Sequence, residues 1–296
     1  MKKVNNTQVV LSILITILSL CAVGASMVWP KGEDQPYEVV TLHGDTALIQ
    51  GSGLYRYDTV TLASQVIAQD HVTLFIGVPL LILATILARR GSLRGRLLLA
   101  GTLAYFLYTY TSYAFGLAYN ALFLVYVALF ALVLFAFVLA LMALDIPTLP
   151  ESFSPRLPRR LIALFLFTLG AFLLTAWLER IVSAALANQS PYGLETNTTL
   201  VIQVLDLGLI VPVSLLGGIL LWQRRPWGYL LSSIILIDGL TYFLALLAMI
   251  IGETLAGVQM STGETAVVLL LVFFGLGMTV TLLRNISTPE KAPVKA

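Results

Sequence analysis

The sequence predicts an all-α polytopic membrane protein, a transmembrane helix bundle of about eight spans with a small extracytoplasmic β-hairpin cap. Hydrophobic residues make up 58% of the 296 residues and charged residues only 11%, whereas a soluble domain carries about 25% charged residues. Apolar stretches of about 20 residues, long enough to cross a hydrocarbon core about 30 Å thick, recur along the chain. Lipid leaves backbone groups no outside partners, and such Leu- and Ala-rich runs satisfy them as helices rather than barrel strands.

Residues 1–30 contain the first apolar run, Val9 to Trp29, behind a basic start. Two interpretations are open. The basic start and the small residues at Val23-Gly24-Ala25 fit a cleaved signal peptide. The length of the run and its interfacial end at Trp29-Pro30 fit an uncleaved transmembrane anchor, which we favour.

Residues 31–69 form a polar segment that we expect to be an extracytoplasmic cap. Tyr37 to Leu42 and Thr46 to Gln50 are β-prone and are separated by a turn sequence, so a hairpin or three-stranded cap is expected. Asp58 is expected to N-cap a helix that continues into the second span.

The remaining spans divide into two groups. The first-half helices occupy 70–146, the Pro-rich cytoplasmic linker 147–158, the second-half helices 159–284 and the cytoplasmic tail 285–296. The spans themselves are expected at 70–88, 97–115, 118–144, 160–183, 199–222, 227–251 and 265–284, with a very short connection around Gly116.

The distribution of basic residues predicts the orientation. With the N-terminus inside, the outer side keeps only Lys31, Arg56 and Arg180 of the 17 lysines and arginines. Cytoplasmic loops carry the excess of Lys and Arg in membrane proteins. We therefore expect a multi-pass protein of the cell membrane with both termini cytoplasmic.

An internal repeat is also expected, although Leu-rich spans can resemble one another by chance. Gln69-Asp70, Val78-Pro79 and Arg89-Arg90 precede Gly95 and Tyr105-Phe106-Leu107. The same order of features recurs at Gln203 and Asp206, Val211-Pro212, Arg224-Arg225, Gly228 and Tyr242-Phe243-Leu244. The pattern predicts two parallel halves related by an axis along the membrane normal.

Ionisable side chains inside the spans are the candidate functional residues, because such groups are costly in lipid and face the bundle. Asp238 lies midway along its span, and Asp206 follows Gln203 by about one turn. Each could bind a ligand or simply fix helix packing. Glu179 and Arg180 lie near the outer end of another span, where Arg180 could pair with Asp206 or Glu179.

Tyrosines of the third span complete the candidate site. Tyr105 and Tyr108 are deep enough to turn inward, where a hydroxyl needs a partner. Together with the polar residues above they are expected to line an outward-facing polar cavity. Asp70 and His71 begin the second span at the interface, where we expect them to be solvated.

The sequence shows no catalytic, metal or cofactor motif. It lacks a Walker A loop, a GxGxxG turn, HExxH and CxxC, and it has one cysteine, Cys21, and two histidines, His43 and His71. Nothing in it indicates nucleic-acid binding. The expected partners are the lipid bilayer and a small solute or ion, with no cofactor, and the sequence does not indicate an oligomeric state.

Tyr119-Asn-Ala-Leu-Phe-Leu-Val-Tyr126 and Arg224-Arg-Pro-Trp-Gly-Tyr229 resemble segments of uncharacterised prokaryotic multi-span membrane proteins. The resemblance extends over about residues 58 to 284 and implies a bacterial or archaeal membrane but no activity. The leading function hypothesis is therefore binding or transport of a small solute or ion. A sensor or assembly partner acting through residues 31–69 is the second hypothesis, and a membrane-embedded enzyme, for which no nucleophile–base pair is visible, is the third.

Overall fold

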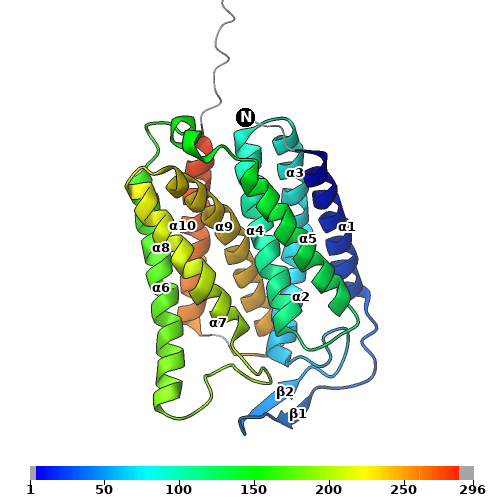
Figure 1. The fold of residues 1–296 in the computed structure, drawn as a ribbon. Coiled ribbons are helices and arrows are strands. Elements are labelled where there is room, and N and C mark those ends of the chain that lie inside the picture. Colours follow the sequence, from blue (N-terminus) through cyan, green and yellow to red (C-terminus); the bar gives the residue numbers. More distant parts are fainter. Residues whose placement is uncertain (1–4, 260, 287–296) are drawn as a thin grey trace, which may run out of the picture.

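The computed structural model describes residues 5–259 and 261–286, and most of them belong to helices. The expected tail 285–296 therefore lies almost wholly outside the described residues. The helices run side by side along one direction, with the short sheet at one end of the bundle (Figure 1).

Within the described part of the chain, seven continuous helical segments are long and apolar enough to cross a membrane, which identifies a multi-pass integral membrane protein. Two of these segments consist of an α-helix, a π-helical turn and a second α-helix. The seven are α1 (Asn6–Val28), α2–η1–α3 (Val60–Val72, Thr73–Gly77, Val78–Arg89), α5 (Phe123–Met142), α6 (Arg159–Leu186), α7–η3–α8 (Val201–Leu205, Asp206–Ile210, Val211–Trp222), α9 (Pro226–Leu255) and α10 (Thr262–Arg284).

One further long helix, α4 (Leu93–Gly116), is less apolar because it carries several tyrosines and threonines. It runs the length of the bundle and packs against α3, α5 and α9 (Figure 1). Its tyrosines at 105, 108, 110 and 113 are all buried. Polar side chains on α4 therefore meet their partners inside the protein rather than in lipid.

The π-helical turns both lie next to a proline. Pro79 and Pro212 are at the start of α3 and α8, directly after η1 and η3. Proline has no N–H to donate to the preceding turn, so the backbone there needs a different hydrogen-bond pattern. A π-turn is a common local adjustment of this kind and is frequent at functional sites.

The expected hairpin is present as two antiparallel strands, β1 (Tyr37–Val40) and β2 (Thr46–Ile49), with Tyr37 paired to Ile49 and Val40 to Thr46. The helix expected to lead into the second span is present as α2, so residues 60–69 are helical and precede the span expected at 70–88. Its N-cap is Thr59, whose side chain accepts from the Leu62 N–H, and not Asp58 as the sequence suggested. The connection after Gly116 is also longer than expected, because α5 begins only at Phe123.

Several turns and one short helix meet at the end of the bundle opposite the hairpin. The N-terminal end of α1, the α3–α4 and α8–α9 turns and the 3-10 helix η2 (Ile146–Ser152) lie together at the end opposite the hairpin (Figure 1). The linker after η2 is bound to the end of α10, since Ser154 N–H donates to Asn285 O at 2.7 Å. Helix α4 is bound to the same end, since the Arg94 guanidinium donates to Ile286 O at 2.6 Å.

Four geometric features of residues 73–95 recur in residues 206–228 with the same separation along the chain. The π-turns begin at Thr73 and Asp206, and the prolines are Pro79 and Pro212. Positive φ angles occur at Gly91 and Arg224. A Cβ added to Gly95 would lie 2.5 Å from Ala88 N, and one added to Gly228 would lie 2.1 Å from Leu221 N, so both glycines permit the same helix crossing.

Candidate functional site

Helix α4 directs its tyrosines to two sides, which creates two polar clusters. Tyr105, Thr109 and Tyr113 are four residues apart and share a face, which points toward α2 and η1. Tyr108 lies on another face and points toward η3. We call the two groups the Asp70 cluster and the Asp206 cluster. The Asp70 cluster contains Asp70 and the side chains around it, which are Ser26, Tyr55, Gln69, Thr73, Tyr105, Thr109, Tyr113 and Tyr126.

The Asp206 cluster consists of Asp206, Tyr108, Trp177, Tyr242 and Asp238. Tyr108 OH donates to Asp206 Oδ1 and Trp177 Nε1 donates to Asp206 Oδ2, both at 2.8 Å. Tyr242 OH donates to Tyr108 OH at 3.4 Å, and the two rings meet edge to face with centroids 4.7 Å apart. Two neutral donors thus satisfy both oxygens of a carboxyl group that is only 5% exposed.

Asp238 lies one helical turn before Tyr242 on α9 and is 6% exposed. Asp206 is close enough to act on it electrostatically. Within the described residues, Asp238 Oδ1 is buried and finds no hydrogen-bond partner. A buried carboxyl oxygen without a donor costs free energy, and a bound proton, water or cation would offset that cost.

Gln203 is one turn before Asp206 and borders a cavity of about 460 Å³ between α6, α7 and the loop that joins them. The cavity is also lined by Ile181, Leu194, Thr198, Thr199, Leu200, Val204 and Leu207. Of the residues predicted from sequence, Asp206, Asp238 and Tyr108 are therefore in one cluster and Gln203 lies beside it.

Of the other three predicted residues, Tyr105 and Glu179 lie apart from this cluster and Arg180 lies beside it. Tyr105 OH is 2.8 Å from Thr73 Oγ1 in the Asp70 cluster. Glu179 is exposed. The Arg180 guanidinium lies over the rings of Trp177 and Tyr192, 5.5 Å from each centroid, and across residues 5–259 and 261–286 it forms no salt bridge with Asp206 or Glu179. Stacking on Trp177, rather than the expected ion pair, places Arg180 next to the Asp206 cluster.

The Asp70 cluster was hardly predictable from the sequence. Ser26 Oγ and Tyr55 OH donate to Asp70 Oδ2 at 2.6 and 2.7 Å, and Tyr113 OH donates to Oδ1 at 3.0 Å. Tyr126 OH is 3.3 Å from Tyr55 OH. Asp70 is 3% exposed, so the expectation that it is solvated at the interface was wrong.

Tyr55 belongs to the segment between the hairpin and α2 and connects that segment to the bundle. Burial, with a smaller effect of Asp70, raises the pKa of Tyr55 well above its ordinary value. Tyr55 therefore remains a protonated donor to Asp70. Within the cluster the only useful sequence signal was the four-residue spacing of Tyr105, Thr109 and Tyr113, which matches Gln69 and Thr73 on the facing helix.

Asp58 provides a third buried carboxyl group, outside the membrane-spanning helices. Its Oδ1 accepts from the Ala118 N–H at 2.7 Å, while Oδ2 is buried without a partner among the described residues. Burial raises the pKa of Asp58 from 3.8 to about 7, against the smaller opposing effect of the Ala118 hydrogen bond.

This raised pKa makes the stability of the protein depend on pH. The unfolded chain releases the Asp58 proton near pH 4 and the folded chain near pH 7, so the folded state binds more protons between these values. The Asp58 contribution is therefore fully present below about pH 4 and is lost as the pH rises to about 7. We expect the thermal unfolding temperature of the wild type to fall from pH 5 to pH 8 more than that of Asp58→Asn.

Tryptophan fluorescence of the detergent-purified protein would measure this difference, with Asp34→Asn, an exposed carboxyl group, as the control. Equal pH profiles for the wild type and Asp58→Asn would contradict the assignment to Asp58.

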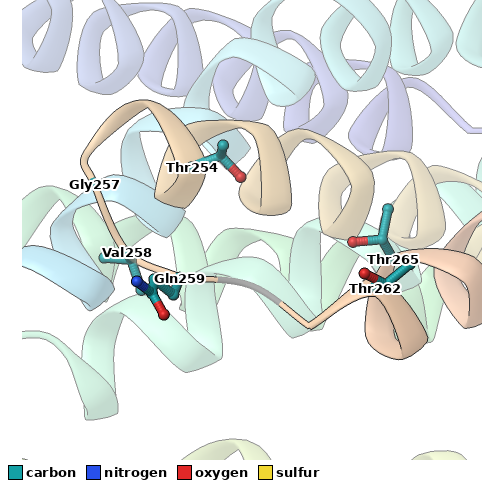
Figure 2. A pocket seen from close by; sticks show the side chains of 6 residues that line it. All are labelled: Thr254, Gly257, Val258, Gln259, Thr262 and Thr265. Atoms are coloured by element: carbon teal, nitrogen blue, oxygen red, sulfur yellow. The ribbon is translucent and has the colours of Figure 1, made fainter.

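A second cavity, of about 600 Å³, lies at the turn between α9 and α10 (Figure 2). Its lining is neutral and consists of Thr254, Gly257, Val258, Gln259, Thr262 and Thr265. Among the described residues, no three His, Cys, Asp or Glu side chains are grouped so that they could hold a metal ion.

No family model, curated protein or solved structure matches this chain.

Proposed function

We propose that this protein crosses the cell membrane eight times and binds or transports a small solute or cation at the Asp206 cluster. The eighth span is α4, and its length of 24 residues and its path alongside the other helices support this count. Helix α1 packs against α3 and α5, which favours a retained anchor over a cleaved signal peptide.

The orientation rests on the two ends of the bundle. Arg89, Arg90, Arg224 and Arg225 belong to turns at the end opposite the hairpin. The excess of basic residues in cytoplasmic loops favours this end as the inner one. The hairpin and the cavity beside Gln203 are then extracytoplasmic.

The two halves are proposed to be copies of one ancestral unit. The recurrence of the π-turn, the proline and the close glycine at one constant separation supports this proposal more strongly than shared Leu-rich composition does. Contacts between the halves fit a two-fold relation as well. In this correspondence α4 matches α9 and α2 matches α7. The matched helices α4 and α9 pack on each other, α2 packs on α9, and α7 packs on α4.

On this proposal the halves differ chemically at two positions. At the constant separation of the π-turns and prolines, Asp206 and Asp238 correspond to Thr73 and Tyr105, whereas the sequence pattern matches Asp206 with Asp70 and Tyr242 with Tyr105. Thr73 and Tyr105 are joined by a neutral contact of 2.8 Å, whereas Asp206 and Asp238 are two buried carboxyl groups. Carboxyl groups are costly at this depth, so their presence at two positions where the first half has a threonine and a tyrosine favours a function over a shared packing role.

The observation that carries the proposal is the buried Asp238 Oδ1, which has no donor within the described residues although Asp206 beside it has two. A cation or a polar solute would provide the missing partner. The cavity beside Gln203 offers a route from the hairpin end, because it is also lined by Leu207, one residue after Asp206.

Uptake of radiolabelled Na⁺, Rb⁺ and a panel of small organic cations into proteoliposomes would test this function. We expect Asp206→Asn and Asp238→Asn each to lower uptake by about tenfold, which corresponds to about 1.4 kcal/mol of lost interaction. Asp34→Asn makes the same chemical change at an exposed position and should leave uptake unchanged. Uptake that both cluster variants retain in full would remove the transport proposal.

A further inference from the structure

A row of polar side chains follows the inner face of α1. Gln8, Ser12 and Ser19 are buried, and Ser26 at the far end donates to Asp70. At 1.5 Å per residue, the distance along the helix from Gln8 to Ser26 is about 27 Å, close to the hydrocarbon thickness of about 30 Å. The row therefore extends over nearly the whole depth of a membrane.

Several groups of this row have no hydrogen-bond partner among the described residues. They are Gln8 Oε1 and Nε2, Ser19 Oγ, and Tyr110 OH on the facing helix α4. The side chains are only 2%, 0% and 1% exposed, respectively. Leaving a buried amide or hydroxyl group unpaired costs about 1–3 kcal/mol, and ordered internal water is the usual partner of such groups.

The hydroxyls of Ser19 and Tyr110 face each other between α1 and α4. They are close enough to act on each other directly, but their geometry falls short of a full hydrogen bond. A water molecule beside the pair would complete the hydrogen bonding of both groups.

The row continues from Tyr110 to the hairpin end. The Tyr110 ring lies 5.9 Å from the ring of Tyr113, which donates to Asp70. Asp70 is joined through Tyr55 to Tyr126. Asp58, whose Oδ2 is unpaired among the described residues, acts electrostatically on Tyr126. Polar groups thus recur from Gln8 to the extramembrane carboxyl group of Asp58, with the buried Ile15 and Ala22 between those of α1.

The helix that occupies the corresponding place in the second half has no such row. The buried residues of α6 are Ile162, Ala163, Leu166, Leu169 and Gly170. Its Thr175 is exposed and donates to its own helix at Ala171 O. Helix α1 packs on α3 and helix α6 packs on α8, and both α3 and α8 follow a π-turn. Because α6 packs in this position with an apolar face, the packing itself does not require a polar face on α1.

We propose that the first half contains a chain of internal water along α1 that conducts protons between the two ends of the bundle through Asp70. Each oxygen along the chain accepts a proton from one neighbour as it passes its own proton to the next, so one O–H bond forms for each that breaks. Gln8 orients water at the inner end, and Asp70 is the acid–base group at the outer end. This pathway is separate from the Asp206 cluster and does not depend on the function proposed for it.

Proton flux would be measured with the full-length protein in proteoliposomes that contain a pH-sensitive dye, driven by a potassium gradient and valinomycin. We expect the wild type to acidify these vesicles, and Ser19→Val and Asp70→Asn to reduce the rate by about tenfold. Thr175→Val on α6 is the matched control and should leave the rate unchanged. Asp206→Asn should also retain proton flux, which separates this result from a failure of the transport proposal.

Hydroxyl-radical footprinting gives a second readout that does not depend on flux. Radicals formed in internal water should modify Tyr110 although it is 1% exposed, and should spare Phe106, which is 0% exposed on the same helix. Flux that equals that of protein-free vesicles, flux that Ser19→Val does not change, or a Tyr110 that stays unmodified would each overturn the proposal.

Discussion

Replacing Gly228 with alanine is expected to prevent most of the protein from folding. An added Cβ would lie 2.1 Å from Leu221 N and 2.3 Å from Leu220 C, and both are backbone atoms of the preceding helix. A flexible side chain could move aside, but the backbone of α8 can move only by separating α8 from α9. Overpacking in a close-packed interior typically costs about 1–3 kcal/mol, and a clash with backbone on this scale should exceed that range.

The measurement is the yield of monodisperse protein in size-exclusion chromatography, together with its thermal unfolding temperature. Gly277→Ala is the control, because no atom lies within 4 Å of its added Cβ. Alanine is the better helix former by about 1 kcal/mol, so this variant should be as stable as the wild type or slightly more stable. A Gly228→Ala protein that unfolds at the wild-type temperature would show that α8 and α9 do not approach each other this closely at Gly228.

Gly95 allows the α3–α4 crossing in the same way, so Gly95→Ala should have a similar effect. Equal sensitivity at Gly95 and Gly228 would also support the duplication. If the halves were similar only in their Leu-rich composition, there would be no reason for the two crossings to depend on the same glycine.

Hydropathy predicted the membrane-spanning helices well, because lipid requires long apolar segments and the sequence records them directly. The span expected at 97–115 is helix α4, although its tyrosines and threonines make it less apolar than the other spans. The π-turns could not be predicted, since Pro79 and Pro212 require some irregularity but the packing around each helix determines its form.

The candidate site was only partly predictable. The depth of Asp206, Asp238 and Tyr108 followed from their positions in the spans, and these three residues are in one cluster. Trp177 was missed because an indole at mid-span is indistinguishable from an apolar core residue in sequence. Arg180 was expected to form an ion pair, but the aromatic rings of Trp177 and Tyr192 occupy the space around its charge.

Asp70 was interpreted wrongly because its three donors, and the tyrosine that extends their network, come from four separate parts of the chain. Ser26 is on α1, Tyr55 precedes α2, Tyr113 is on α4, and Tyr126 on α5 extends the network through Tyr55. No local spacing relates these residues to one another. A carboxyl group at the start of an apolar run is usually solvated, and only the tertiary structure brings three hydroxyl donors to this one.

Asp70→Ala is therefore expected to destabilise the protein strongly. Three hydrogen bonds to the carboxyl group are lost, and at about 1 kcal/mol net for each the free energy of unfolding should fall by about 3 kcal/mol. Two of the three donors have another acceptor, which reduces the loss of stability. Tyr113 OH is 3.2 Å from Val66 O, and Ser26 Oγ is 2.9 Å from Val23 O. Tyr55 has only the longer contact to Tyr126, so the segment that carries it should detach first.

Asp70→Asn separates this structural role from proton conduction. The amide retains an acceptor oxygen and nearly the same volume, so its stability should stay within about 1 kcal/mol of the wild type, while its proton flux falls. Unfolding in nanodiscs, monitored by tryptophan fluorescence, would compare Asp70→Ala, Asp70→Asn and Tyr55→Phe, with losses expected in the order Ala, Phe, Asn. If Asp70→Ala were as stable as the wild type, the three hydroxyl groups could not be bound to this carboxyl group in the folded protein.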